Sequence, residues 1–273
     1  MTECPLCGNG QSVSVYAGSP FFRCLRCGIV FNTAHSPLSY SDSYFTDEYR
    51  AQYGRTYEED FYNITRASRI RVKHIRKLWN EAHLVSPHSL LDIGSALGFF
   101  LKAASDEGFT RVEGLEISDF AANYCRKRFG FSVIDKSFES AELTRKYDVI
   151  TAWYFLEHCA DTQGALRKIT MALNDGGIFA FSAPSTFGAL YLFSRKKWVD
   201  THPVDHRIDF SPRTVRRTLK ALGFKKIIVR AAGIHPERVM SRRNPLYFIF
   251  APLYRSFSRR FAFSDTIEVY AIK

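Results

Sequence analysis

The stretch Leu90-Leu-Asp-Ile-Gly-Ser-Ala-Leu-Gly-Phe-Phe100 decides the fold of this chain. Its apolar start predicts a buried strand, its glycines a tight turn, and its end the first turn of a helix. An acidic residue, Glu116, lies near the end of the next strand-like run, 112–117. A strand, a glycine turn and a helix with an acid about 20 residues further on can hold an adenosine. The turn lets the backbone approach the ligand, and the carboxylate accepts hydrogen bonds from the ribose hydroxyls.

The glycine spacing separates two kinds of adenosine ligand. A dinucleotide turn, Gly-x-Gly-x-x-Gly, would need glycines at 94, 96 and 99, but Ala96 and Phe99 occupy the last two positions. The observed spacing, Gly94-x-x-x-Gly98, therefore disfavours a pyrophosphate ligand. The alternative without a ligand is an ordinary strand-to-helix turn of an α/β protein.

Strands and helices alternate beyond Pro87. The expected strands are 89–93, 112–117, 132–135, 147–152, 177–182, 225–229 and 266–272. The expected helices are 58–82, 98–107, 119–129, 162–173 and 212–222, the last with Ser211 as N-cap and proline at its first position. This alternation predicts an α/β fold with a Rossmann-like, seven-stranded, doubly wound sheet. No regular helix is expected between the last two strands, which predicts an antiparallel last strand at the sheet edge.

Four of the six cysteines form two closely spaced pairs, Cys4-x-x-Cys7 and Cys24-x-x-Cys27. Each pair can turn two thiolates towards one tetrahedral ion, so the pattern predicts a structural zinc in a small N-terminal ribbon. Residues 13–16 and 21–23 can form its hairpin. Two disulfides or a redox pair are the alternatives. We expect Cys125 and Cys159 to be buried thiols.

These patterns divide the chain into a zinc ribbon at 1–33, a connector and helical cap at 34–86, and a main domain at 87–273. A basic and aromatic insertion occupies about 234–263 of that domain. No apolar run approaches the ~20 residues that span a bilayer. The N-terminus also lacks the basic and apolar regions of a secretory signal. We therefore expect a cytoplasmic protein, either free or attached to the inner face of the membrane.

The net charge of +11 is unevenly distributed. Residues 195–263 contain 17 basic and 4 acidic residues, a net charge of +13, and the rest of the chain carries −2. Such a surface favours an anionic partner, unless it is only a solvated basic face. In the insertion Leu253, Tyr254 and Phe257 share a helical face. The insertion is therefore a lid, a contact with anionic membrane or a homodimer contact, and nucleic acid is the least favoured partner.

The opening Asp92-x-Gly94 resembles motif I of class I S-adenosylmethionine-dependent methyltransferases, (D/E)-x-G-x-G-x-G, with Ala96 at the middle glycine. The resemblance to such an enzyme with an N-terminal zinc ribbon runs nearly end to end. It covers the ribbon, 91–100, 114–118, 147–158, 173–184, 198–210 and 267–273. The resemblance implies S-adenosylmethionine as the cofactor. Bacterial relatives of this kind often act on sugars, glycolipids or small metabolites.

The resemblance also implies a set of cofactor-binding residues, which meet beyond the carboxyl ends of the strands. Those around the methionine and ribose are Asp92, Gly94, Ser95, Gly98 and Glu116. Those beside the adenine are Ile117, Ser137 and Phe138. Trp153 and Tyr154 follow the fourth strand, where an aromatic face can stabilise the sulfonium cation. Plain core packing is the alternative for these two aromatic residues.

Two polar segments are candidates for catalysis. Related O-methyltransferases of the ubiquinone pathway and of small-RNA 2′-O-methylation bind a divalent metal through Glu-x-x-Glu-His. Here Tyr154 occupies the first glutamate position before Glu157-His158, which disfavours a catalytic metal. Glu157 and His158 then form a buried polar pair, or His158 is a general base or substrate contact.

The second polar segment is His202-Pro-Val-Asp-His-Arg207. Relatives that C-methylate nucleotide sugars have Tyr-x-Glu-His near this point; Asp205 and His206 match the acid and histidine, and Pro203 replaces the tyrosine. A carboxylate beside an imidazole can orient it for general-base work, so His206 is the favoured base. The alternative is that His206 caps the following helix or packs at the sheet edge.

The combined prediction is a methyltransferase that O-methylates a sugar, a glycolipid or a related small metabolite. Three alternatives stay open: an RNA methyltransferase, a C-methyltransferase acting on a nucleotide sugar, and a non-catalytic binding module with a methyltransferase fold. The acceptor is beyond the sequence, because the same fold carries many functions.

Overall fold

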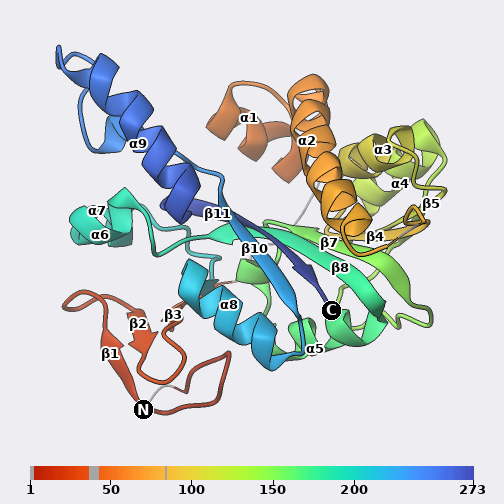
Figure 1. The fold of residues 1–273 in the computed structure, drawn as a ribbon, viewed down its shortest axis with the longest axis horizontal. Coiled ribbons are helices and arrows are strands. Elements are labelled where there is room, and N and C mark those ends of the chain that lie inside the picture. The colour runs from red at the N-terminus through yellow and green to blue at the C-terminus, as the bar shows by residue number, and fades with distance from the viewer. Residues whose placement is uncertain (1–2, 37–42, 84) are drawn as a thin grey trace. The chain divides into compact units, whose positions relative to one another are not determined.

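The computed structural model describes residues 3–36, 43–83 and 85–273, apart from the side chain of residue 52 (Figure 1). Contacts within the chain group it into two compact units. The first unit comprises Met1–Pro37, Tyr154–Arg167 and Phe181–Ala271. The second comprises Leu38–Trp153, Lys168–Ala180 and Ile272–Lys273. Part of the predicted connector, residues 37–42 and 84, lies outside the described residues.

The secondary structure alternates as the sequence predicts. The strands are β1 (Ser12–Ser14), β2 (Phe21–Cys24), β3 (Val30–Asn32), β4 (Ser89–Ile93), β5 (Arg111–Leu115), β6 (Ser132–Ile134), β7 (Tyr147–Trp153), β8 (Leu173–Pro184), β9 (Ile208–Asp209), β10 (Lys226–Ala231) and β11 (Thr266–Ile272). The helices and helical turns are η1 (Tyr44–Glu48), α1 (Tyr49–Tyr53), α2 (Phe61–Asn80), α3 (Phe99–Asp106), α4 (Asp119–Phe129), η2 (Leu156–His158), α5 (Thr162–Ala172), α6 (Ala189–Phe193), α7 (Arg195–Asp200), α8 (Pro212–Ala221), η3 (Pro236–Arg238) and α9 (Tyr247–Phe261).

Seven strands form one mixed sheet in the order β10-β11-β8-β7-β4-β5-β6, with the last strands antiparallel. β4 is an interior strand, next to the central β7, and pairs in parallel with both β5 and β7. All five residues of β4 are buried. This confirms the predicted Rossmann-like sheet. The carboxyl ends of β4, β5 and β7 therefore meet at one edge, where ligands bind in such folds.

Two details of the prediction at the end of the chain are wrong. β11 lies between β8 and β10 rather than at the edge of the sheet. A regular helix, α9, also connects β10 to β11 (Figure 1). Pro252 lies inside this helix, where proline removes a backbone donor. A proline in mid-segment is a signal against a helix, which is why the sequence pattern did not predict α9 as a whole.

The N-terminal segment that carries the cysteine pairs contributes three strands to a second, four-stranded sheet in the order β1-β2-β3-β9. The predicted hairpin is present, with β1 antiparallel to β2. The fourth strand comes from far along the chain, since Val30 lies opposite Asp209 and Phe31 opposite Ile208. This sheet lies within the first unit, and its β3–β9 pairing fixes the segment after His206 against β3. A two-residue strand has no periodicity, so the sequence could not predict this pairing.

Local sequence features determine where α8 begins and which side of α2 is buried. Ser211 accepts a hydrogen bond from the Thr214 amide, and Pro212 follows it as the sequence predicts. α2 turns Val72, Ile75 and Leu78 inward and packs against α3. In the part of the chain that the structure describes, no helix is both long and apolar enough to cross a membrane.

Candidate functional site

The turn after β4 brings two glycines against their neighbours. Gly98 has a φ of +82°, and a Cβ there would lie 2.3 Å from Cys125 Sγ. A Cβ on Gly114, in β5, would lie 2.4 Å from Ser95 Oγ. Both positions therefore require glycine for space, and Gly98 also for its left-handed backbone. The hydroxyl of Ser95 is buried and has no hydrogen-bond partner among the described residues. The turn therefore contains a buried hydroxyl to which a ligand could form a hydrogen bond.

The carboxylate of Glu116 lies directly over this turn. Its Oε2 accepts the Ala96 amide at 2.8 Å and its Oε1 accepts the Ser118 amide at 2.9 Å. The side chain is buried, which raises its pKa, while these amides and the amide of Ile117 act against that rise. Two amide donors hold the carboxylate in one orientation. This geometry fits the predicted role of Glu116 towards ribose hydroxyls.

Asp92 is a second buried carboxylate at the end of β4. Its Oδ1 accepts a hydrogen bond from Thr151 Oγ1 at 2.6 Å. Burial raises its pKa to about 7, although the Thr151 bond and the charge of Arg71 act in the opposite direction. A carboxylate with so little compensating charge is suited to a cationic ligand group.

Arg71, on α2, lies beside two of the predicted site residues, and the sequence did not single it out. Its guanidinium lies 4.3 Å from the ring centroid of Trp153, which also packs against Phe100 at 5.2 Å. The cation therefore lies on the aromatic face that was predicted for the sulfonium, near Asp92. The sequence signal that could have identified Arg71 is its position on a helix: the residues at helical spacing from this arginine are apolar.

The predicted adenine contacts differ in exposure. Ile117 is 56% exposed although it lies two residues after the buried end of β5. Ser137 caps a local turn by accepting the Ser140 amide at 3.2 Å. Phe138 is buried, and the Lys168 ammonium lies 4.7 Å from its ring centroid. Of these three side chains, Ile117 offers the most open surface to a ligand.

Tyr154 begins the part of the first unit that follows β7. It has a φ of +54° and its side chain is 46% exposed. A non-glycine residue in this region is strained and persists where surrounding bonds hold it. Here the Tyr154 amide donates to Ser182 Oγ at 2.9 Å. The strained backbone presents the aromatic ring to the surface instead of packing it in a core.

A polar cluster lies within the first unit and is made of Glu157, His158, His202, Asp205, His206 and Asp209. Asp205 pairs with His158, with 2.9 Å between Asp205 Oδ2 and His158 Nδ1, instead of orienting His206 as the sequence suggested. Burial lowers the pKa of His158, but the Asp205 bond and the charges of Glu157 and Asp205 outweigh it, so the net pKa is raised. Asp205 therefore orients a histidine 47 residues away from it in sequence.

His206 lies between two groups of this cluster. Its ring centroid is 4.9 Å from that of His158 and 5.3 Å from that of His202. Burial lowers the pKa of His206 to about 4, so its ring is neutral at pH 7. A base of such low pKa takes up a proton poorly at neutral pH, and this weakens the assignment of His206 as the free base.

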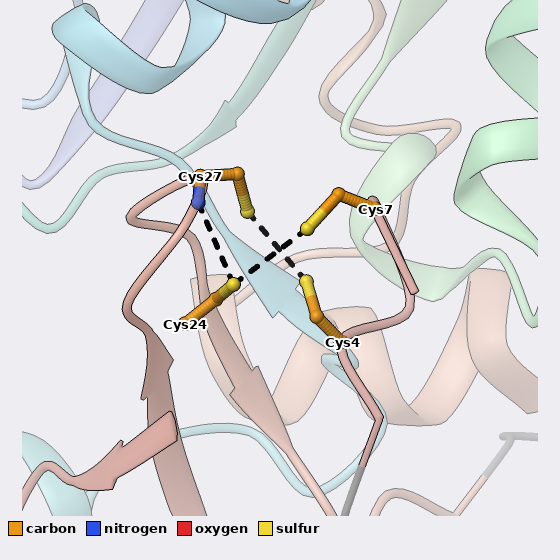
Figure 2. Close-up of side chains that lie close together, drawn as sticks. All are labelled: Cys4, Cys7, Cys24 and Cys27. Carbon is orange, nitrogen blue, oxygen red and sulfur yellow. Dashed lines mark hydrogen bonds between the residues drawn. The ribbon is translucent and has the colours of Figure 1, made fainter. Parts of the chain in front are cut away.

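The four N-terminal cysteines converge as the sequence predicts (Figure 2). Cys4 Sγ lies 3.6 Å from Cys27 Sγ, and Cys7 Sγ lies 3.6 Å from Cys24 Sγ. Four thiolates around a tetrahedral zinc lie about 3.8 Å apart, given Zn–S bonds of ~2.3 Å. The Cys27 amide points to Cys24 Sγ at 3.5 Å, as in a metal knuckle. All six cysteines are free thiols, so the disulfide alternative is not what the structure has. The donor set fits a structural zinc.

Comparison with known families shows to which family this chain belongs. Residues 62–229 match the model of a family described as a methyltransferase domain. The chain belongs to this methyltransferase family. It is also 29% identical over 135 residues to the malonyl-[acyl-carrier protein] O-methyltransferase of Acetivibrio thermocellus. That match covers 48% of this chain but only 42% of the length of the relative.

Solved structures support the same fold. A SAM-dependent methyltransferase from Archaeoglobus fulgidus is similar with a TM-score of 0.55 at 15% identity, over 85% of this chain and 100% of that one. The plantazolicin methyltransferase in complex with SAH reaches 0.56 at 14%, over 85% and 92%. A possible histamine N-methyltransferase from Thermotoga maritima reaches 0.54 at 18%, over 80% and 94%. The fold of this methyltransferase family member is therefore that of class I S-adenosylmethionine-dependent methyltransferases.

Proposed function

We propose that this chain binds S-adenosylmethionine and methylates an oxygen of a sugar, a glycolipid or a related small metabolite. The observation that carries the proposal is the carboxylate of Glu116, held by two backbone amides over a turn with an unpartnered buried hydroxyl at Ser95. An acid fixed in this way suits a ribose diol. Membership of the methyltransferase family supports the same cofactor.

Each part of the cofactor has a residue of matching chemistry in the second unit. The bound cofactor would supply an electrophilic methyl group on a sulfonium. Glu116 would accept hydrogen bonds from the ribose, and Asp92 suits the ammonium of the methionine part. Arg71, with its permanent charge, suits the carboxylate of that part. The exposed side chain of Ile117 offers an apolar surface that would suit the adenine. The roles predicted for Gly94, Ser95, Gly98, Ser137, Phe138, Trp153 and Tyr154 stay predictions.

The acceptor oxygen must lose a proton as it forms its bond to the methyl carbon. The carbon–sulfur bond breaks in the same step, and the sulfur keeps the electron pair. We propose that this proton passes to the polar cluster of the first unit, in which Asp205 orients His158 and His206 lies beside them. These are the three residues predicted as catalytic from the sequence. Asp205 and His158 together form the polarised pair that His206 and Asp205 were expected to form.

Calorimetry with S-adenosylmethionine and S-adenosylhomocysteine is the first test. We expect micromolar binding of both by the full chain. Absence of binding would remove every enzymatic hypothesis and leave the non-catalytic binding module. With binding established, methyl transfer from labelled cofactor to lipid, sugar-nucleotide and RNA fractions separates the O-methyltransferase from its enzymatic alternatives. Label in RNA, together with copurifying RNA, would favour the RNA methyltransferase instead.

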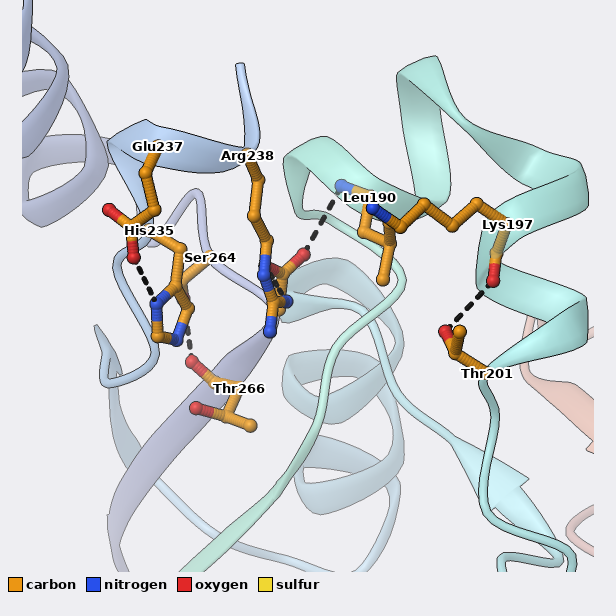
Figure 3. Close-up of polar contacts among 9 residues, drawn as sticks. Leu190, Lys197, Thr201, His235, Glu237, Arg238, Ser264 and Thr266 are labelled. Atoms are coloured by element: carbon orange, nitrogen blue, oxygen red, sulfur yellow. Dashed lines mark hydrogen bonds and ion pairs between the residues drawn. The ribbon is translucent and has the colours of Figure 1, made fainter. Parts of the chain in front are cut away.

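Helix α9 supports a glycolipid among the acceptor classes. Six apolar residues on or next to it are exposed: Leu246, Phe248, Ile249, Leu253, Phe257 and Phe261. Residues 238–263 also contain six arginines and no acid. The segment before α9 is held by an ion pair of Arg238 with Asp265, which also accepts the Leu190 amide at 3.3 Å (Figure 3). An apolar, basic helix on a fixed base suits the surface of an anionic membrane.

Flotation with vesicles tests this membrane contact. We expect the chain to float with vesicles of phosphatidylcholine and phosphatidylglycerol, and less with phosphatidylcholine alone. The double variant Phe248→Ser/Leu253→Ser should lose the interaction, whereas Met171→Ser, at a residue exposed in α5, should keep it. A chain that stays at the bottom with both vesicles removes the membrane contact and leaves a lid or a homodimer contact for α9.

We also propose that Cys4, Cys7, Cys24 and Cys27 hold a structural zinc. Their sulfur spacing supports it, and four sulfur ligands leave no open position for catalysis. Because β9 pairs with β3, this ion would also stabilise the strand that follows His206.

A further inference from the structure

One carboxylate in the polar cluster, that of Glu157, is buried without the partners that such burial requires. Glu157 is 0% exposed, whereas Asp209, 1% exposed, has His202 Nε2 at 3.2 Å from its Oδ2. Within the described residues, no hydrogen-bond donor reaches either oxygen of Glu157. An ionised carboxylate taken out of water costs several kcal/mol unless a cation or donors compensate it. The charge of His158 acts on Glu157, but neither oxygen of Glu157 receives a direct bond from a cation or a donor of the described residues.

Three ligand atoms surround this gap. One atom each from Glu157, His158 and His206 lies within 4.8 Å of the other two. We propose that these three residues bind a divalent transition-metal ion, distinct from the ion of the four cysteines. Two imidazole nitrogens and one carboxylate oxygen form a donor set that suits zinc, iron or nickel. A three-residue site keeps at least one coordination position open, and His158 is 20% exposed at its side chain.

The surroundings of His158 have the form expected of a metal ligand. A ligating histidine commonly gives its second ring nitrogen to a carboxylate, which sets its tautomer and orientation. His158 Nδ1 lies 2.9 Å from Asp205 Oδ2, which leaves its Nε2 as the ligand atom. Near His206, Asp209 pairs with His202, with 3.2 Å between Asp209 Oδ2 and His202 Nε2. Of the two histidines, His158 is thus the one that a buried carboxylate orients.

The sequence motif disfavours a metal because Tyr154 replaces the first glutamate of Glu-x-x-Glu-His. The motif, however, includes only ligands from one segment of the chain. In the structure the third ligand comes from His206, which η2 and the strand β9 bring beside Glu157; the Arg207 amide donates to the Glu157 carbonyl at 2.7 Å. The backbone bond fixes the two segments in register. The missing glutamate is therefore replaced by a histidine from elsewhere in the first unit.

The open coordination position would hold an oxygen of the acceptor and make its hydroxyl more acidic. This role rests on the proposed function. Binding of the ion itself does not, because it needs neither S-adenosylmethionine nor an acceptor.

Cobalt content tests the proposal with the full chain in the absence of cofactor. After exchange into Co²⁺, we expect two cobalt ions per chain by mass spectrometry of the metal, and one in His206→Ala and in Glu157→Gln. The sulfur-to-cobalt charge-transfer band of the cysteine site should be unchanged in both variants, which also reports that the first unit is folded. His235→Ala, at an exposed histidine paired with Glu237, should keep both ions.

The proposal is overturned if the wild-type chain binds cobalt only at its cysteines, or if both variants keep two ions. Should both variants lose the sulfur band and therefore the fold, the wild-type count decides: two ions support the site and one sulfur-bound ion removes it. None of these outcomes depends on binding of S-adenosylmethionine. Failure of the metal proposal therefore does not contradict the proposed function.

Discussion

The glycine turn after β4 and the polar cluster around His206 differ in how they satisfy their charges. In the turn, Glu116 receives backbone amides from residues within 20 positions of it. In the cluster, Glu157 is also buried but receives no hydrogen-bond donor from the described residues, and Asp209 has His202 Nε2 at 3.2 Å from its Oδ2. Backbone amides close in sequence thus satisfy the carboxylate of the turn. The carboxylate of Glu157, surrounded by side chains from distant segments, keeps a deficit that a ligand or ion could fill.

The largest effect is expected for a variant of His158, which should change turnover but not cofactor affinity. His158→Ala should lower methyl transfer by about 10²–10⁴-fold, because it removes the imidazole that Asp205 orients at the acceptor side. The affinity for S-adenosylmethionine should stay unchanged. Turnover with labelled cofactor and calorimetry measure the two quantities. His88→Ala, at an exposed histidine before β4, is the matched control. Loss of cofactor affinity in His158→Ala would mean that the two sites are not separate.

Asp92 should give the cofactor-free protein a stability that depends on pH. Its pKa is about 7 in the folded chain, because of burial, and about 3.9 when unfolded. The folded state therefore favours the protonated acid. The stabilisation is fully present below about pH 4 and is lost as the pH rises through 7. The shift corresponds to at most about 4 kcal/mol in the free energy of unfolding.

Urea denaturation at pH 5 and pH 8 measures this difference. Asp92→Asn should reduce it, whereas Asp175→Asn, at an exposed aspartate, should not. An unchanged difference between the two pH values in Asp92→Asn would show that Asp92 is ionised in both states.

Glu116→Ala should weaken binding of S-adenosylmethionine by about 30–100-fold. The loss of charge-assisted hydrogen bonds to the ribose contributes roughly 2–3 kcal/mol. The amides of Ala96 and Ser118 also lose their acceptor. Calorimetry compares the variant with Glu142→Ala, at an exposed glutamate of the same unit. Wild-type affinity in Glu116→Ala would place the ribose elsewhere.

Gly98→Ala tests how closely the turn is packed. Its added Cβ would meet Cys125 Sγ, and its φ is left-handed. We expect a loss of roughly 1–3 kcal/mol in the free energy of unfolding. Gly130→Ala has a similar φ of +73° but open space around the Cβ, so it should lose only about 1 kcal/mol. Equal losses in urea denaturation would mean that backbone strain alone, and not contact with Cys125, requires glycine at 98.

Residues close in sequence were the ones whose roles could be predicted. The helix start at Ser211 and Pro212, the turn at 94–98 and the cysteine pairs are local patterns, and the structure has them. The pairing of Asp205 was assigned to its neighbour His206, but the structure pairs it with His158. Neighbouring residues point in different directions along a chain, so adjacency in sequence says little about which side chains meet.

By itself the sequence determined the methyltransferase fold, the position of the glycine turn after β4 and the gathering of the four cysteines. Each of these depends on backbone conformations and spacings that a short segment encodes. Only the tertiary structure decided that β9 joins the ribbon sheet, that Arg71 lies on Trp153 and that Glu157 is buried beside two histidines. Those contacts join segments tens to hundreds of residues apart. They form only after the chain has packed, because their energy comes from burial and charge shared between segments.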